Sequence, residues 1–240
     1  MAGPQCCSNP PTLDPNSGDG HVEKVGGLSA YVTGSSKTKL AIVLISDIYG
    51  YEAPKLRKLA DKIAAAGFFV AVPDFFHGDP FIIEESATRP IPVWLKDHGT
   101  DKGLEEAKQV ILDIKSQGFT AVGAAGFCWG GKVVADLAKT DFIHAGVLLH
   151  PAFVTVDDCK EFKKPLAILA AEVDQWAPPE LIHQYENALS ERTDKIDYFV
   201  KLFPGVAHGW TVRYADNEEA IRRANESHED LLNWVTKYVK

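Results

Sequence analysis

The chain has 240 residues, of which 45% are apolar and 24% are charged, the composition of a globular protein that can bury its own core. Its 33 acidic and 25 basic side chains give a net charge of −8, which argues against nucleic acid or an anionic membrane as the main partner. Composition therefore excludes some classes of partner but names no substrate.

The four cysteines indicate neither a disulfide framework nor a metal site. Cys6 and Cys7 are adjacent in a polar, proline-rich stretch without the histidine spacing of a zinc site, whereas Cys128 and Cys159 stand alone. We therefore expect no metal, and no pattern in the chain indicates a cofactor. No stretch resembles a signal peptide or is apolar for long enough to span a bilayer, so we expect a cytoplasmic protein.

The first third of the chain predicts a flexible tail followed by a strand–helix–strand unit. Residues 1–20 are rich in Pro, Asn, Ser and Gly, as loosely ordered tails are. Gly26-Gly27 joins two short apolar runs, which indicates an antiparallel hairpin. The continuous apolar runs that follow are typical of parallel strands buried on both faces. In chain order we expect strands at 22–25, 28–32, 40–45 and 68–72, with a helix at 54–66.

The rest of the chain predicts an irregular excursion and further alternating strands and helices. Residues 75–100 are rich in Pro, His and aromatic side chains, as a lid or pocket wall often is. No repeat or linker interrupts the alternation, so residues 21–240 are expected to form one α/β domain with helices on both faces of a mostly parallel sheet. Strands are expected at 120–125, 145–150, 166–171 and 197–203, and helices at 101–117, 132–139, 178–189 and 217–239.

The stretch Gly126-Phe-Cys-Trp-Gly-Gly131 has the context of a nucleophile elbow, in which a tight turn joins a strand to a helix. Cysteine stands where such turns usually have serine, and glycines flank it two residues away on each side. Side chains at the flanking positions would collide with the neighbouring strand and helix. The turn would hold Cys128 at the positive end of a helix, which favours a thiolate. The alternative is that Cys128 is a small buried apolar residue, as free cysteines often are.

Polar residues follow most of the predicted parallel strands, whose carboxyl ends form the ligand-binding edge of such sheets. The order Cys128, Asp174, His208 matches the nucleophile–acid–histidine order of α/β-hydrolases. His208 would accept the thiol proton, and Asp174 would fix its tautomer, although Asp is also a common turn residue. Backbone N–H groups of Ile48 and Trp129 are placed to stabilise an oxyanion. We expect His150, which ends a strand, to be a hydrogen-bonded structural residue.

Aromatic side chains near these strand ends predict a small apolar pocket. His77, His98 and Arg89 are weaker candidates for its wall because they lie in the irregular excursion. The residues expected to line the pocket are Tyr49, Phe76, Trp94, Trp176, Trp210 and Arg213.

Several of these motifs together resemble the dienelactone hydrolase family, from about Gly27 to the C-terminus. The matching pieces are the GFCWGG elbow, the loop 46–50, the segment 73–76, Asp174 and the His208-Gly209 pair. The resemblance implies the α/β-hydrolase fold, a Cys128–His208–Asp174 triad, oxyanion donors at Ile48 and Trp129, and hydrolysis of esters or enol lactones through a thioester. It also implies a gating role for Asp47, where bacterial members have Glu. Arg213 or Arg89 could bind a substrate carboxylate, but neither clearly matches the family's arginines.

Two other functions remain open. Eukaryotic relatives include carboxymethylenebutenolidase-like esterases, and plant members of the family carry an endo-1,3;1,4-β-glucanase label. Glucan hydrolysis needs two facing carboxyl groups, for which Asp47, Glu52, Asp74 and Asp174 are candidates, although the cysteine has no role in that chemistry. A non-enzymatic ligand receptor could also use this scaffold. The expected partner is a small ester or lactone, or alternatively a glucan, and the protein is expected to be a monomer or homodimer.

Overall fold

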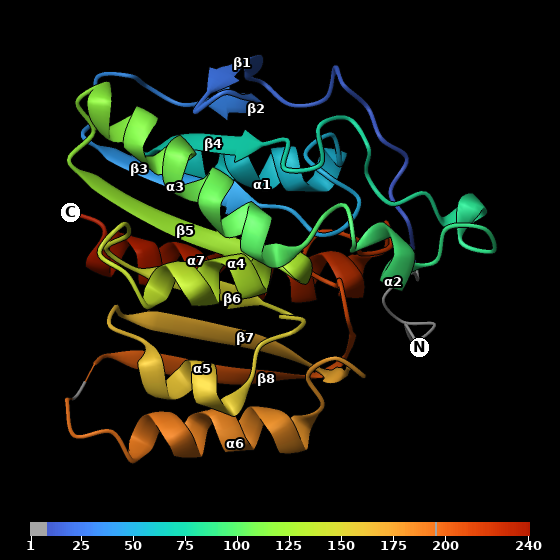
Figure 1. The fold of residues 1–240 in the computed structure, drawn as a ribbon, viewed down its shortest axis with the longest axis vertical. Helices are drawn as coiled ribbons and strands as arrows, with labels where there is room; N and C mark the ends of the chain where they lie inside the picture. The colour runs from blue at the N-terminus through green and yellow to red at the C-terminus, as the bar shows by residue number, and fades with distance from the viewer. Residues whose placement is uncertain (1–8, 195) are drawn as a thin grey trace.

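The computed structural model describes residues 9–194 and 196–240 as one eight-stranded sheet with helices packed on both faces (Figure 1). Cys6 and Cys7 lie outside the described residues. The strands are β1 His21–Val25, β2 Leu28–Thr33, β3 Leu40–Ile45, β4 Phe69–Pro73, β5 Ala121–Phe127, β6 Gly146–Leu149, β7 Leu166–Val173 and β8 Tyr198–Ala207. The helices are α1 Pro54–Ala65, α2 Ile91–Trp94, α3 Thr100–Ser116, α4 Trp129–Ala138, α5 Val156–Glu161, α6 Pro179–Ser190 and α7 Glu218–Tyr238, with a 3-10 turn η1 at Ile83–Glu85.

The sheet order is β1-β2-β4-β3-β5-β6-β7-β8. The β1–β2 and β2–β4 pairs are antiparallel, and every pair from β4 to β8 is parallel. The predicted α/β-hydrolase fold, with N-terminal antiparallel strands on a mostly parallel sheet, is therefore confirmed. Because β3 to β8 run in one direction, their carboxyl ends lie along one edge, where the loops that follow them can meet.

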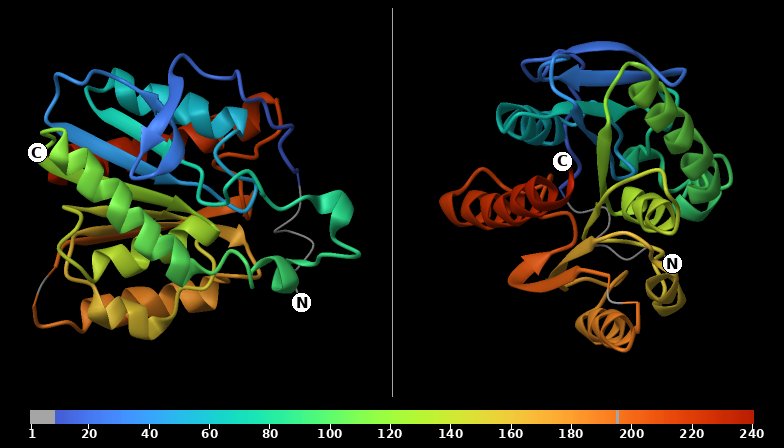
Figure 2. Two further views of the ribbon diagram at one scale, coloured as in Figure 1. Left: turned by 45° about the horizontal axis from the view of Figure 1, so that its top comes forward. Right: turned by 90° about the vertical axis from the view of Figure 1, so that its left-hand side faces the viewer.

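The apolar strands supply both layers of the core. In β3, Ala41, Val43 and Ile45 face one layer while Ile42 and Leu44 face the other, which is the period of two that a strand imposes. The first layer is completed by α3, α4, α5 and α6, and the second by α1 and α7 (Figure 2). None of the described helices is both long and apolar enough to cross a bilayer.

Three elements differ from the sequence expectation. The short helix α5 was not expected, because six residues are too few for an apolar period, but a capping box between Thr155 and Asp158 begins it. The excursion 75–100 contains η1 and α2. Strand β8 runs on to Ala207, and its pairing with β7 becomes irregular between Ala171 and Val173.

Residues 9–20, part of the expected tail, are tied to the domain by hydrogen bonds. The amide of Asp14 donates to the carbonyl oxygen of Glu52 at 3.0 Å. Nη1 of the buried Arg57 donates to the carbonyl oxygens of Pro15 and Ser17 at 2.8 and 3.2 Å. The guanidinium of Arg57, on α1, therefore binds the backbone of this segment to the domain.

Candidate active site

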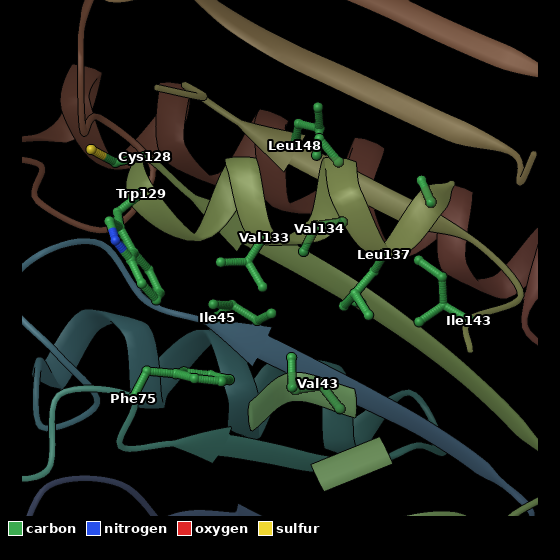
Figure 3. Packing of buried hydrophobic residues seen from close by; sticks show 14 of the residues in the cluster. Val43, Ile45, Phe75, Cys128, Trp129, Val133, Val134, Leu137, Ile143 and Leu148 are labelled. Atoms are coloured by element: carbon green, nitrogen blue, oxygen red, sulfur yellow. The ribbon is translucent and has the colours of Figure 1, made fainter. Parts of the chain in front are cut away.

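Cys128 lies in a sharp turn between β5 and α4. Its φ of 53° and ψ of −110° are strained for a residue with a side chain, as in a nucleophile elbow. A Cβ atom on Gly126 would lie 2.1 Å from the carbonyl oxygen of Gly130, and one on Gly130 would lie 2.1 Å from that of Ile45. The two glycines therefore permit the close approach of β5, α4 and β3. Figure 3 shows the Cys128 sulfur at the first turn of α4, directed away from the side chains that α4 packs into the core.

Asp174 and His208 form a buried pair at the ends of the neighbouring strands β7 and β8. Nδ1 of His208 lies 2.7 Å from Oδ2 of Asp174, and both side chains are fully buried. The other carboxylate oxygen accepts the amide of Trp176 at 2.8 Å, which fixes the carboxylate. Nε2 of His208 has no hydrogen-bond partner among the described residues, so the ring presents one nitrogen to the carboxylate and keeps the other unengaged.

Trp129 is anchored by its own side chain. As the first residue of α4, it has a backbone N–H without an intrahelical acceptor. Its indole Nε1–H donates to the carbonyl oxygen of His98 at 2.9 Å. Its ring lies against Gly103, where an added Cβ would come within 2.4 Å of Cη2. Ile48, the other expected oxyanion donor, is buried after β3, and its carbonyl oxygen accepts the amide of Phe81 at 2.8 Å.

Asp47 and Arg213 form a second buried pair next to these elements. Nε of Arg213 lies 2.9 Å from Oδ2 of Asp47, and the two side chains are 2% and 3% exposed. The other oxygen of Asp47 accepts the amide of Tyr49 at 3.0 Å, and the guanidinium carbon of Arg213 lies 5.2 Å from the Tyr49 ring centroid. Asp47, Tyr49 and Arg213 thus form one contact group. From the sequence, Asp47 is expected to gate the thiol, and Tyr49 and Arg213 are expected to line the pocket. No sequence motif indicates the ion pair between Asp47 and Arg213.

The other residues expected to line the pocket lie in three separate places in the structure. Phe76 packs edge-on against Trp94 at 4.8 Å and Trp129 at 4.9 Å, so it belongs to an aromatic cluster between the excursion and α4. Trp176 packs on Phe153 at 4.8 Å. Trp210 lies, with His208 and Arg213, along a cavity of about 330 Å³.

The weaker candidates are engaged within the excursion or on the surface. Arg89 makes two hydrogen bonds of 2.7 Å to the carboxylate of Asp79, and His98 Nε2 lies 2.8 Å from the same group. His77 is exposed and lies 2.8 Å from Glu106. Arg89, His98 and Asp79 therefore hold the excursion together, which places Arg89 in a structural network.

His150 is hydrogen-bonded, as expected, with its Nε2 2.8 Å from Oγ1 of Thr211. Thr211 is a partner of His150 that no sequence motif indicates. In the sequence, Thr211 is marked only by its position three residues after His208. No periodic pattern distinguishes it from other loop residues.

Comparison with known proteins identifies the family of the chain. Residues 28–239 match the model of the dienelactone hydrolase family. A maize protein named endo-1,3;1,4-beta-D-glucanase is 40% identical over 194 residues, which are 78% of this chain and 62% of the maize protein. A mouse carboxymethylenebutenolidase homolog is 32% identical over 92% of each chain.

Solved structures show the same fold. A putative dienelactone hydrolase from Klebsiella pneumoniae gives a TM-score of 0.72 at 20% identity, covering 88% of this chain and 93% of that one. The dienelactone hydrolase-like promiscuous phosphotriesterase P91, from metagenomic libraries, gives 0.73 at 17% identity, with coverages of 91% and 98%. The family match covers nearly the whole described chain and includes the elbow and the Asp174–His208 pair. The chain therefore belongs to the dienelactone hydrolase family of hydrolases.

Proposed function

We propose that this hydrolase cleaves carboxylic esters or lactones with Cys128 as nucleophile, His208 as base and acid, and Asp174 as the group that orients His208. The observation that supports the proposal most directly is the 2.7 Å contact between Nδ1 of His208 and Asp174, at the same edge of the sheet as a cysteine held in a strained strand-to-helix turn. The carboxylate favours the tautomer with a proton on Nδ1, which leaves Nε2 as the base.

The proposed reaction has two stages. In the first, Nε2 of His208 takes the thiol proton as the sulfur of Cys128 attacks the substrate carbonyl carbon. The tetrahedral oxyanion accepts hydrogen bonds from the N–H groups of Ile48 and Trp129. The bond to the leaving oxygen breaks, and His208 gives its proton to that oxygen, leaving a thioester. In the second, His208 takes a proton from water as the water oxygen attacks the thioester, and it returns the proton to the departing sulfur.

The contacts of Asp47 favour a role other than the gating of the Cys128 thiol that the family resemblance implies. Its carboxylate oxygens already contact Arg213 and the amide of Tyr49. A carboxylate with these partners would have to give one up in order to hold a thiol. We therefore infer that His208 holds the resting thiol of Cys128 and that Asp47 acts on substrate binding through Arg213.

The test compares aryl esters and lactones as substrates for the wild type, Cys128→Ala, His208→Ala and the control Cys159→Ala. Cys159 is equally buried but lies in α5, away from His208, so its replacement should leave turnover within about twofold. Loss of turnover in the first two variants alone is the expected result. Full activity in Cys128→Ala would overturn the cysteine mechanism, and tight binding without turnover in the wild type would indicate a receptor.

Alkylation provides a second test. Burial raises the pKa of the Cys159 thiol to about 12, so this cysteine should react slowly with iodoacetamide near neutral pH. Cys128, at the start of α4 and on the sheet edge that bears His208, should react faster. Peptide mass spectrometry would follow both, and equally slow rates would show that Cys128 is not activated.

A glucanase is the second candidate, because two carboxyl groups share a cavity of about 280 Å³. Glu52 and Asp74 line this cavity together with Tyr49 and Tyr51, and burial raises the pKa of Asp74. A carboxylic acid with a raised pKa beside a carboxylate and aromatic rings suits glycoside hydrolysis. Cleavage of mixed-linkage glucan that survives Cys128→Ala but not Asp74→Asn would favour this function.

A further inference from the structure

His150 occupies a central and strained position at the catalytic edge. It follows β6, which lies between β5 and β7 in the sheet, so it stands between the strand ends that bear Cys128 and Asp174. Its φ is 38°, in the left-handed region that side chains avoid, and the residue is fully buried. Such strain persists only where surrounding contacts hold it, and it is concentrated at functional sites.

Two contacts connect His150 to His208. The ring centroids lie 4.9 Å apart at an interplanar angle of 66°, so the rings pack edge to face. The second contact is the 2.8 Å hydrogen bond between His150 Nε2 and Oγ1 of Thr211, in the turn that begins at His208. The carbonyl oxygen of Thr211 accepts Nε2 of His228, on α7, at 2.8 Å. The turn that carries His208 is thus attached to β6 on one side and to α7 on the other.

The charges around His150 favour a neutral ring. Burial lowers its pKa well below 6.5, and the nearby His208 and Arg213 act in the same direction. Other ionisable groups at this edge include Asp174, which is paired with His208, Asp47, which is paired with Arg213, and the Cys128 thiol. A neutral ring at this place supports His208 without repelling the imidazolium that forms during the proposed reaction.

We propose that His150 is a positioning residue for His208, because its ring and its hydrogen bond to Thr211 fix the imidazole with Nδ1 toward Asp174 and Nε2 toward the thiol. This inference rests on the proposed role of His208 as the base for Cys128. His150 itself touches neither substrate nor the reacting atoms in this scheme. It acts through Thr211 and through ring packing.

The test compares substitutions at Thr211 and His150 with a control substitution of another buried hydroxyl. Thr211→Val keeps the side-chain shape but loses the hydrogen bond, whereas Thr211→Ser keeps the hydroxyl and should restore most of the function. Ser227→Ala is the matched control, because it deletes another buried hydroxyl that donates over 2.7 Å, to the carbonyl oxygen of Ala224 on α7. His150→Phe preserves ring packing and removes both nitrogens.

Three readouts separate positioning from general stability. In Thr211→Val and His150→Phe, kcat for an aryl ester should fall about three- to tenfold with KM unchanged, the range that one net hydrogen bond supports. The rate of Cys128 alkylation near neutral pH should fall about threefold, because a displaced imidazole accepts the thiol proton less well. The low-field proton signal of His208 Nδ1–H should broaden or disappear. Thr211→Ser and Ser227→Ala should match the wild type in all three.

The outcomes also separate this inference from the proposed function. A wild type that neither hydrolyses esters nor alkylates preferentially at Cys128 would refute the proposed function, while the Nδ1–H signal would still show whether His150 and Thr211 position the ring. The positioning role would be overturned if the wild type does both while Thr211→Val and His150→Phe lose only melting temperature. In that case kcat, the alkylation rate and the proton signal would be unchanged.

Discussion

Replacing Gly126 by Ala tests whether the tight elbow holds the proposed nucleophile in place. An added Cβ would lie 2.1 Å from the carbonyl oxygen of Gly130, 2.4 Å from its carbonyl carbon and 2.8 Å from the amide nitrogen of Gly131. All three are backbone atoms, so no flexible side chain can move aside. Ordinary contacts begin near 3.4 Å, and the first turn of α4 must therefore shift by about 1 Å relative to β5.

This shift should lower both the melting temperature and the turnover of Gly126→Ala. Overpacking of this kind costs about 1–3 kcal/mol, and at about 3 °C per kcal/mol for a chain of this length the melting temperature should fall by about 3–9 °C. A displacement of about 1 Å at a catalytic group can reduce turnover about 100-fold. Calorimetry and aryl-ester kinetics on the same preparation would measure both.

Gly205→Ala is a control for a glycine substitution that causes no clash. Gly205 has a φ of 73° with no atom within 4 Å of an added Cβ, so its substitution reports the cost of the backbone conformation without a clash. It should lose about 1 kcal/mol and leave kcat within about twofold. If Gly126→Ala kept full activity and the stability of this control, the close approach of β5 and α4 would not be what holds Cys128.

Two further predictions concern charge and the N-terminal segment. Burial alone would raise the pKa of Asp158, but hydrogen bonds from Lys132 and Lys139, at 2.7 and 2.5 Å, lower it to about 2. Because this pKa lies below the ordinary 3.8, a stabilisation of about 2 kcal/mol is complete above about pH 4 and is lost as the pH falls toward 2. Urea unfolding from pH 2 to 7 should show that slope, and its persistence in Asp158→Asn would refute the assignment. Arg57→Met should remove the bonds that hold residues 15–17 and speed hydrogen exchange at the Asp14 amide by at least tenfold, whereas unchanged exchange would mean that other contacts hold the segment.

The features that were predictable from the sequence depend on local patterns. The run 40–45 is apolar and β-branched, and the structure places β3 at the same six residues. The glycines around Cys128 indicated an elbow, and the observed φ of 53° is the conformation that such a turn requires. In contrast, α5 has only six residues and depends on one capping box, so no periodicity could indicate it.

The excursion was less predictable because its contacts follow no period. The resemblance to the family makes Arg89 a candidate for substrate binding, yet the structure pairs it with Asp79, which no sequence motif indicates. The hydrogen bonds of Asp79 to Arg89 and His98 lower its pKa to about 2. Such a network follows from how an irregular chain folds back on itself, and composition alone gives no information about it.

Contacts between strand-end loops depend on sheet order as well as chain order. The nucleophile, acid and histidine appear in the chain in the order of α/β-hydrolases, so their roles could be expected. The place of β6 between β5 and β7 is a property of the sheet, and it brings the His150 ring to within 4.9 Å of the His208 ring, although 58 residues separate them in the chain. The same geometry brings Asp47, after β3, to Arg213, after β8. Residues that are far apart in the chain therefore supply much of the immediate surroundings of the proposed base, and substitutions among them should lower turnover more than they lower the stability of the fold.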